Sequence, residues 1–281
     1  MGYPRPENRN VRRHWHDDQM ARVLIEEEAA RVQDAQPSSG PVIKLSEVTY
    51  RDAADRVIVD RLSLAVQPGE VYCLLGSHGA GKTTVVDLIL GLRRPSSGSL
   101  SVADTNPAEE PAAVRRLVAH VTTSALYPSQ SALENLRLLS ALSGALDRTA
   151  DSEYRNTLRR LGVPDRHIEC ALWLAPAEVP VAVCLAAAYL RGVPAVVLDE
   201  PAAKLDSRAA VRFADGVRLL RDAGAAVLLA TSDASLAAQV SDMVALLKNG
   251  VKVAERRKTQ FSGEDVFSLI TDYLGAAGSA S

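Results

Sequence analysis

The chain has 281 residues, of which 47% are hydrophobic and 23% are charged, a composition typical of soluble globular proteins with a buried core. Its 32 Lys and Arg residues and 34 Asp and Glu residues give a net charge of −2. That balance excludes a protein that binds nucleic acid over its whole surface, because neutralising phosphates requires massed cations. We therefore expect no nucleic-acid partner. The three cysteines are too few for a disulfide framework and lack the spacing of metal ligands.

Residues 1–41 are expected to form a polar N-terminal extension. They hold six Arg, no Lys and seven acidic residues, and they end in the turn-forming run QPSSGP. A helix is predicted from Asp17 to Val32, so the segment is either a partly disordered extension or a helix that docks on the core or on a partner. It lacks the apolar run of a signal peptide. The longest apolar run, from Val179 to Leu190, is shorter than the roughly 20 residues that span a bilayer, so no membrane-spanning helix is expected.

From Val42 onward strand and helix patterns alternate, which predicts an α/β domain over residues 42–258. Apolar runs of strand length predict β-strands at 42–48, 62–66, 71–75, 195–198 and 226–230. Residues 241–255 are typical of a hairpin, because Asn249-Gly250 is a strong turn signal. Helical periodicity dominates residues 104–190, which predicts an inserted helical lobe. Residues 259–281 are expected to form a short C-terminal helix and a flexible tail.

A phosphate-binding motif, G-x-x-x-x-G-K-[ST], follows the predicted strand at 71–75. Its candidate ligand-binding residues are Gly76, Ser77, His78, Gly79, Ala80, Gly81, Lys82, Thr83 and the following Thr84. A strand, this loop and a helix in that order identify a P-loop, whose backbone N–H groups point at phosphate oxygens at the start of a helix. In such a loop the lysine reaches the β- and γ-phosphates, and the hydroxyl of the following residue, here Thr83, ligates Mg²⁺. The expected cofactors are ATP and Mg²⁺.

Two carboxylates, Asp199 and Glu200, follow the apolar strand predicted at 195–198. In P-loop ATPases the first acid holds the Mg²⁺ shell, and an adjacent glutamate can polarise the attacking water. We therefore expect Asp199 to bind the metal together with Thr83, and Glu200 to be the catalytic residue.

These two elements and their spacing resemble the nucleotide-binding subunit of an ATP-binding cassette (ABC) transporter, from about Val42 to Glu255. The resemblance rests on three segments. The first is VQPGEVYCLLGSHGAGKTTVVDLILGLRRPSSGSL, and the second is ALYPSQSALENLRLLSALSG, which is similar to the helical lobe of bacterial exporter subunits. The third is LDEPAAKLD, which places Asp206 at the D-loop aspartate. It implies a P-loop NTPase core with a mainly parallel sheet, an N-terminal antiparallel β subdomain and an inserted helical lobe. It also implies that two subunits enclose two ATP molecules, each between one P-loop and the other subunit's signature motif, and that closure drives a membrane-embedded permease.

Three motifs of the family are degenerate in this sequence. Where the signature LSGGQ is expected, residues 174–178 are Leu-Ala-Pro-Ala-Glu, which lack the serine hydroxyl, lose an N–H at the proline and add a negative charge. The Q-loop position holds Thr122 or Thr123, whose side chains are too short to reach the metal and water equally well. The position of the switch histidine holds Ser232, followed by Asp233.

The resemblance and the departures together predict an ATP-binding subunit that binds Mg-ATP at its P-loop and hydrolyses it weakly. Loss of one preorganised transition-state donor typically costs about 10²–10³ in rate, so an ABC-type ATPase with impaired turnover is expected. The adenine-stacking aromatic is Tyr50, which lies one or two residues from the usual place and is otherwise an ordinary aromatic on a strand.

Dimer closure of this subunit is expected to drive or gate a membrane permease subunit. A heterodimer with a second ATP-binding subunit is favoured over a homodimer, and the expected location is cytoplasmic, peripheral on the inner face of the cell membrane. Two alternatives remain open: a non-catalytic regulatory nucleotide-binding subunit, and a soluble ABC-type ATPase without a permease.

Overall fold

The computed structural model describes residues 40–143, 150–203 and 205–258. Residues 1–40 and residues 41–281 belong to separate units, and the fold described here is that of the second unit. The predicted N-terminal extension with its helix at 17–32, and the predicted C-terminal helix and tail, lie outside the described residues.

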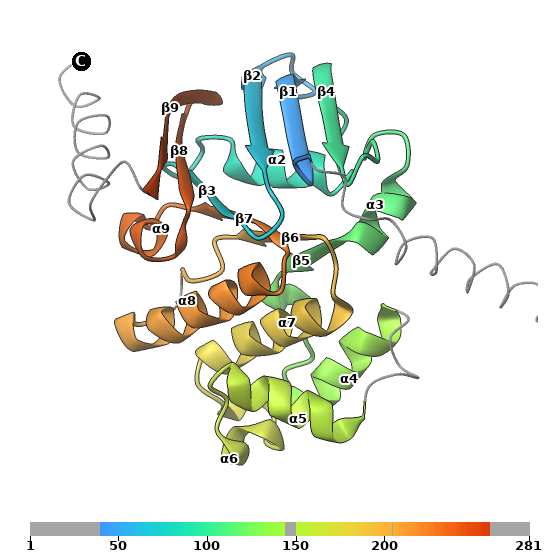
Figure 1. Cartoon of the computed structure of the whole chain (residues 1–281), viewed down its shortest axis with the longest axis vertical. Coiled ribbons are helices and arrows are strands. Elements are labelled where there is room, and N and C mark those ends of the chain that lie inside the picture. Colours follow the sequence, from blue (N-terminus) through green and yellow to red (C-terminus); the bar gives the residue numbers. More distant parts are fainter. Residues whose placement is uncertain (1–39, 144–149, 204, 259–281) are drawn as a thin grey trace, which may run out of the picture. The chain divides into compact units, whose positions relative to one another are not determined.

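An antiparallel three-stranded sheet lies at one end of this unit (Figure 1). Its strand order is β2-β1-β4, with bounds Val57–Val66, Ile43–Arg51 and Ser97–Val102. Apolar side chains on one face, such as Ile43, Leu45 and Leu62, are buried. The alternation of buried and exposed residues along β1 explains why the sequence predicts a half-buried strand there. This sheet is the expected antiparallel β subdomain.

The central sheet has six strands in the order β5-β6-β7-β3-β8-β9. Their bounds are Val118–Val121, Ala195–Asp199, Ala226–Thr231, Val71–Leu75, Met243–Lys248 and Val251–Arg257. Neighbouring strands are parallel except for the β8–β9 hairpin, which turns at Asn249-Gly250 as predicted. Every residue of β3 and β7 is buried. The mainly parallel sheet that the family resemblance implies is therefore confirmed.

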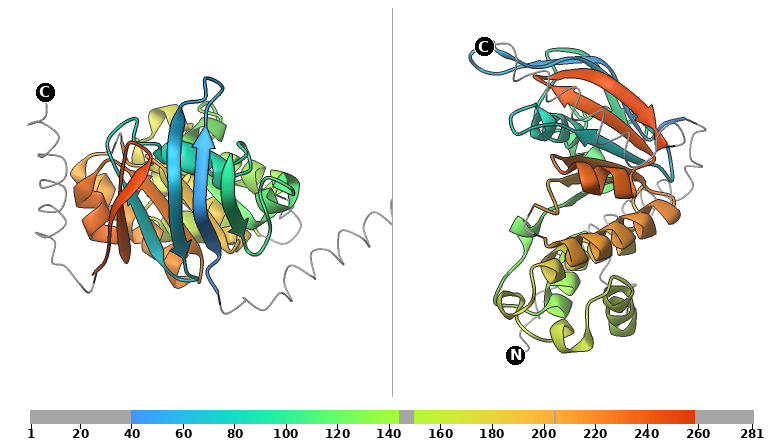
Figure 2. Two further views of the ribbon diagram at one scale, coloured as in Figure 1. Left: turned by 90° about the horizontal axis from the view of Figure 1, so that it is seen from above. Right: turned by 90° about the vertical axis from the view of Figure 1, so that its left-hand side faces the viewer.

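The two faces of the central sheet contribute to two different hydrophobic cores, because successive strand residues point to opposite sides. On β3, Tyr72 and Leu74 belong to the core that contains α2 (Lys82–Ile89) and the three-stranded sheet. Cys73 belongs to the other core, which contains α7 (Glu178–Arg191) and α8 (Ser207–Asp222). Helix α2 thus lies between the two sheets, and the larger helices cover the opposite face (Figures 1 and 2).

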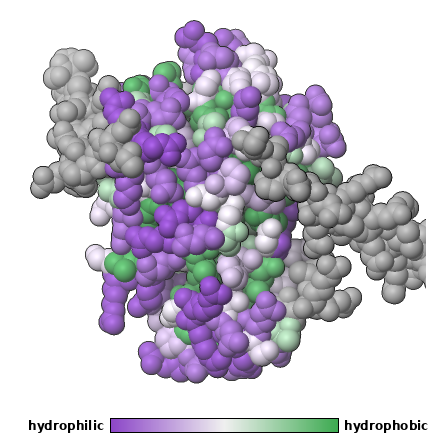
Figure 3. All heavy atoms as spheres, in the orientation of Figure 1, coloured by the Kyte–Doolittle hydropathy of each residue, from purple (hydrophilic) through white to green (hydrophobic). Residues whose placement is uncertain are grey.

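The inserted segment is mostly helical, as expected, and its helices after the first lie toward the end of the unit away from the three-stranded sheet (Figure 1). Its first helix lies beside that sheet and adds Val114 to the same core. The segment contains α3 (Pro111–Leu117), α4 (Ala132–Leu142), α5 (Asp151–Arg160), α6 (Asp165–Ile168) and α7, with the short 3₁₀ turns η1 (Thr123–Ala125) and η2 (Leu172–Leu174). A capping box between Ser131 and Glu134 starts α4. Polar side chains dominate the surface over α5 and α6 (Figure 3).

One element inside the predicted helical lobe is a strand. The four residues of β5 pair in parallel with β6, from Val118 opposite Ala195 to Val121 opposite Leu198. A strand of four residues is too short to overcome the helical periodicity on both sides of it, so the sequence pattern did not separate it. Among the described residues, no helix is both long and apolar enough to cross a membrane.

Replacing Gly250 with alanine is expected to destabilise the fold more than replacing Gly224. Both glycines have left-handed backbones, with φ of +79° and +94°, which costs alanine about 1–2 kcal/mol. A Cβ at Gly250 would lie 2.3 Å from the Ile58 carbonyl oxygen, whereas a Cβ at Gly224 meets nothing within 4 Å. We expect a loss of about 1 kcal/mol in the free energy of unfolding for Gly224→Ala, and of about 2–3 kcal/mol more for Gly250→Ala. Equal losses in urea unfolding would contradict this packing of β2 on the hairpin.

Candidate nucleotide-binding site

The glycine-rich loop joins β3 to α2, the context that the sequence predicts. Gly79 and Gly81 have φ of +81° and +104°, which a side chain would strain. Gly76 has no room for a side chain, since a Cβ there would lie 2.5 Å from the Leu247 carbonyl oxygen. The Gly250 N–H also donates to the Ala80 carbonyl at 2.9 Å. The loop is therefore held by the β8–β9 hairpin, and its tip, Ser77 to Gly79, is exposed.

Lys82 is buried at the start of α2. Its ammonium donates to the carbonyl oxygens of Gly76 at 2.8 Å and Ser77 at 3.0 Å. It also forms an ion pair with Glu200, at 3.1 Å from Oε1. The structure thus brings together the lysine and the carboxylate that the sequence assigned to phosphate binding and catalysis.

Glu200 follows β6 with a left-handed backbone, at φ +44°. Its Oε2 accepts hydrogen bonds from the Ser232 N–H at 3.1 Å, the Ser232 hydroxyl at 3.3 Å and the Thr231 hydroxyl at 3.3 Å. Partial burial by itself would raise the pKa of Glu200, but the Ser232 N–H and the Lys82 ammonium outweigh it and hold the pKa below its ordinary value. The side chain is consequently a carboxylate at neutral pH, the form that can accept a proton from water.

Asp199 lies at the end of β6, directly before Glu200. Its Oδ1 is buried and has no hydrogen-bond partner among the described residues. Thr83 is exposed in the first turn of α2. A buried carboxylate oxygen without a partner and an exposed hydroxyl suit Mg²⁺, which binds one or two protein oxygens together with substrate phosphates. Within the described part of the chain, no group of three or more His, Cys, Asp or Glu side chains could hold a metal by itself.

Tyr50 lies on β1 opposite Val59, on the strand next to β2. Its ring packs on the core around α2. The Arg93 guanidinium lies 5.4 Å from the ring centroid and donates to the Tyr50 hydroxyl at 2.8 Å. Stacking of adenine on Tyr50 would compete with Arg93, so its predicted role stays a prediction.

The residues that the resemblance places in the Q-loop, the D-loop and the signature segment make contacts within the chain. The Thr122 hydroxyl lies 2.9 Å from that of Ser124 and caps η1, which contains Thr123. Asp206, predicted at the D-loop, accepts from the Ala209 N–H at 2.8 Å and caps α8. Glu178, the last residue of the signature segment, is the first residue of α7 and pairs with Arg212 of α8.

Two of these contacts were missed by sequence reasoning: the bonds from Thr231 and Ser232 to Glu200, and the Glu178–Arg212 pair. The first depends on the pairing of two strands that the sequence predicts only separately. Strands β6 and β7 are parallel neighbours with Asp199 opposite Ala230, so the residues that follow them meet at the same edge of the sheet. The second has no signal in the sequence, because 34 residues separate Glu178 from Arg212.

The fold and the site show that the chain is a P-loop protein. A glycine-rich loop follows the buried parallel strand β3, and two carboxylates lie at the end of β6, a second parallel strand of the same sheet. A sequence model of the family described as "ABC transporter" matches residues 59–203. The chain is 32% identical over 213 residues to a probable anion import ATP-binding protein of Haloferax volcanii, covering 70% of this chain and 74% of that protein.

Two further similarities extend this result. The chain is 29% identical over 249 residues to the macrolide export ATP-binding/permease protein MacB of Burkholderia thailandensis, covering 85% of this chain but 37% of that protein. A solved dimeric ATP-binding cassette in a post-hydrolysis state, bound to ADP and Pi, aligns with a TM-score of 0.65 and 22% identity over 77% of this chain and 98% of that one. The chain belongs to the ABC transporter family, in which it is an ATP-binding component.

Proposed function

We propose that this chain binds Mg-ATP at its P-loop, hydrolyses it slowly, and drives or gates a membrane permease. The observation that carries the proposal is that one site keeps the groups for binding ATP but has a serine in place of the switch histidine. Lys82 and Glu200, the groups proposed to bind phosphate and to activate water, form an ion pair at 3.1 Å. Asp199, the residue before Glu200, has a buried carboxylate oxygen without a hydrogen-bond partner among the described residues. Ser232, at the position of the switch histidine, contacts Glu200, and its side chain is too short to reach a γ-phosphate as well.

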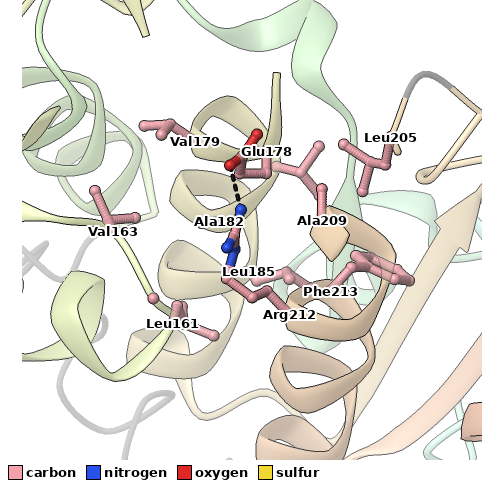
Figure 4. A pocket seen from close by; sticks show the side chains of 12 residues that line it. Leu161, Val163, Glu178, Val179, Ala182, Leu185, Leu205, Ala209, Arg212 and Phe213 are labelled. Atoms are coloured by element: carbon pink, nitrogen blue, oxygen red, sulfur yellow. Dashed lines mark hydrogen bonds and ion pairs between the residues drawn. The ribbon is translucent and has the colours of Figure 1, made fainter. Parts of the chain in front are cut away.

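A pair with a different ATP-binding subunit is the arrangement that the signature segment favours. In a closed family dimer, the start of α7 would face the γ-phosphate bound by the other subunit. Here that position carries the Glu178 carboxylate, which is paired with Arg212 beside a small pocket lined by residues of α7 and α8 (Figure 4). A carboxylate at a phosphate-binding helix N-terminus repels the ligand. Two copies of this chain would form two sites that both face the Glu178 carboxylate, whereas a second subunit with an intact signature would present that signature to the ATP at this chain's P-loop.

We propose that the permease docks on the two neighbouring segments that carry the exposed aromatic side chains of Tyr127 and Trp173. Their side chains are 55% and 68% exposed, and their segments are joined by hydrogen bonds from the Trp173 N–H to the Pro128 carbonyl at 3.0 Å and from the Leu172 N–H to the Gln130 carbonyl at 2.9 Å. Tyrosine and tryptophan are enriched at protein interfaces. A permease as partner is supported by the MacB relative, whose name joins an ATP-binding and a permease function.

Purification of the tagged chain from its native cells in mild detergent tests this proposal. We expect a permease and a second ATP-binding subunit to copurify, and Trp173→Ala to reduce the recovered permease by about tenfold, the loss expected of an interface hot spot. Leu142→Ala is the matched control, because Leu142 is also a large exposed apolar residue, at 78%, but lies at the end of α4.

The other outcomes separate the alternatives. A permease with two copies of this chain would contradict the heterodimer. A complex whose ATP hydrolysis survives Glu200→Gln in this chain would identify a regulatory subunit that does no chemistry. Absence of any permease would favour a soluble ATPase.

A further inference from the structure

Ser232 holds the carboxylate of Glu200 in place, and the sheet sets this contact. Strands β6 and β7 run in parallel with Asp199 opposite Ala230, and the Glu200 N–H donates to the Ala230 carbonyl at 2.9 Å. The residues that follow the two strands are therefore side by side. From this position Ser232 reaches Glu200 Oε2 with both its N–H and its hydroxyl.

The backbone around Ser232 is fixed on both sides. Thr231 is buried, its carbonyl accepts from the Gly76 N–H at 3.1 Å, and its hydroxyl oxygen accepts from the Asp233 N–H at 3.0 Å. Asp233 in turn caps α9 (Ala234–Val240) by accepting from the Leu236 N–H at 3.0 Å. Ser232 is thus set between the P-loop and a helix cap, so its hydroxyl is already placed against Glu200.

The two oxygens of Glu200 have different partners. Oε1 pairs with Lys82 at 3.1 Å, whereas Oε2 is held by Ser232 and Thr231. When the lysine of a P-loop binds nucleotide, it turns to the β- and γ-phosphates. Glu200 then loses a partner on Oε1, and the contacts to Oε2 are the ones that still restrain it.

We propose that Ser232 is a positioning residue that keeps Glu200 oriented for proton transfer once ATP has engaged Lys82. This inference rests on the proposed function, in which water attacks the γ-phosphorus. In that step the water oxygen bonds to phosphorus, a water proton passes to the Glu200 carboxylate, and the bond from the γ-phosphorus to its bridging oxygen breaks with its electron pair on ADP. Ser232 supports the base without contacting the γ-phosphate, which accounts for slow rather than absent hydrolysis.

Steady-state ATPase assays on the full chain, together with equilibrium ATP binding, test the inference. We expect Ser232→Ala to lower kcat by about tenfold, because a hydrogen bond to a charged group is lost while the backbone N–H remains. KM and the ATP Kd should stay within about twofold, since the residue does not contact the nucleotide. Ser232→Thr keeps the hydroxyl and should restore at least about half of kcat. Ser235→Ala, an exposed serine of α9 three residues further on, is the matched control and should equal the wild type.

A second measurement shows whether Ser232 acts through Glu200. Adding Ser232→Ala to Glu200→Gln should change kcat no further, because residues that act as a unit are not additive. An unchanged kcat in Ser232→Ala, equal losses in the threonine and alanine variants, or a wild-type rate no higher than that of Glu200→Gln would overturn the inference. Each of these results can occur with normal ATP binding, whereas failure to bind ATP would reject the proposed function itself.

Discussion

The Lys82→Ala variant is expected to bind ATP about 100-fold more weakly than the wild type, because charge-assisted hydrogen bonds to phosphate contribute about 1.5–3 kcal/mol. Removal of the ammonium also leaves the Glu200 carboxylate, now without its partner at 3.1 Å, facing an anionic ligand. The two effects act in the same direction. Titration with a fluorescent ATP analogue in the presence of Mg²⁺ measures the change in Kd.

Lys44→Ala provides the control for this measurement. Lys44 is an exposed lysine on β1, so its loss removes the same charge without touching the loop, and the Kd should not change. Urea unfolding of both variants would show whether the fold survives. Binding that is equally strong in Lys82→Ala and the wild type would mean that nucleotide does not occupy this P-loop.

Replacing Glu200 with glutamine is expected to reduce ATP turnover by about 10²–10³, because general-base catalysis contributes about 10²–10⁴ in rate. ATP affinity should stay equal or rise slightly, because glutamine keeps the size of the side chain but removes the negative charge that now pairs with Lys82. The decisive comparison is between kcat from phosphate release and Kd from the same titration.

Glu153→Gln is the control for Glu200→Gln. Glu153 is an exposed carboxylate in the first turn of α5, and its replacement should leave both constants unchanged. If Glu200→Gln kept the wild-type turnover, the general base would be another group or the activity would come from a contaminating ATPase.

Most of the fold could be predicted from the sequence because buried parallel strands appear in it as continuous apolar runs. VYCLL at 71–75 is apolar at every position and is followed by the glycine loop, and Asn249-Gly250 identifies the hairpin. The strand β5 was not predicted, because its four residues lie between helical segments and it is recognisable as a strand only through its pairing with β6. Its existence depends on tertiary structure, which local periodicity does not contain.

The site was predicted to a similar extent. Motif and strand context single out Lys82, Asp199 and Glu200, and the structure brings Lys82 and Glu200 into contact. The functional roles of the three residues stay predictions. The contacts of Ser232 with Glu200 were not predicted, because the comparison with a histidine at that position concerns only how far the side chain reaches. The hydrogen bonds to Glu200 depend on the register of β6 with β7, which no local pattern specifies.

The contact between Glu178 and Arg212 was beyond sequence reasoning for a different reason. The sequence shows a carboxylate at the end of the segment aligned with the signature motif, but its partner Arg212 lies on α8, which follows β6 in the sequence. Packing of α7 on α8 produces this pair, and the helix faces that meet are set by the common core.

The most direct test of the account measures ATP binding and ATP turnover on one preparation of the full chain with Mg²⁺. We predict saturable ATP binding that depends on Lys82. The kcat should be at least about a hundredfold below the roughly 10 s⁻¹ typical of enzymes, and Glu200→Gln should abolish this residual rate. A kcat near that typical value would contradict the claim that the degenerate motifs impair hydrolysis. Absence of saturable binding would contradict the claim that this chain binds ATP at its P-loop.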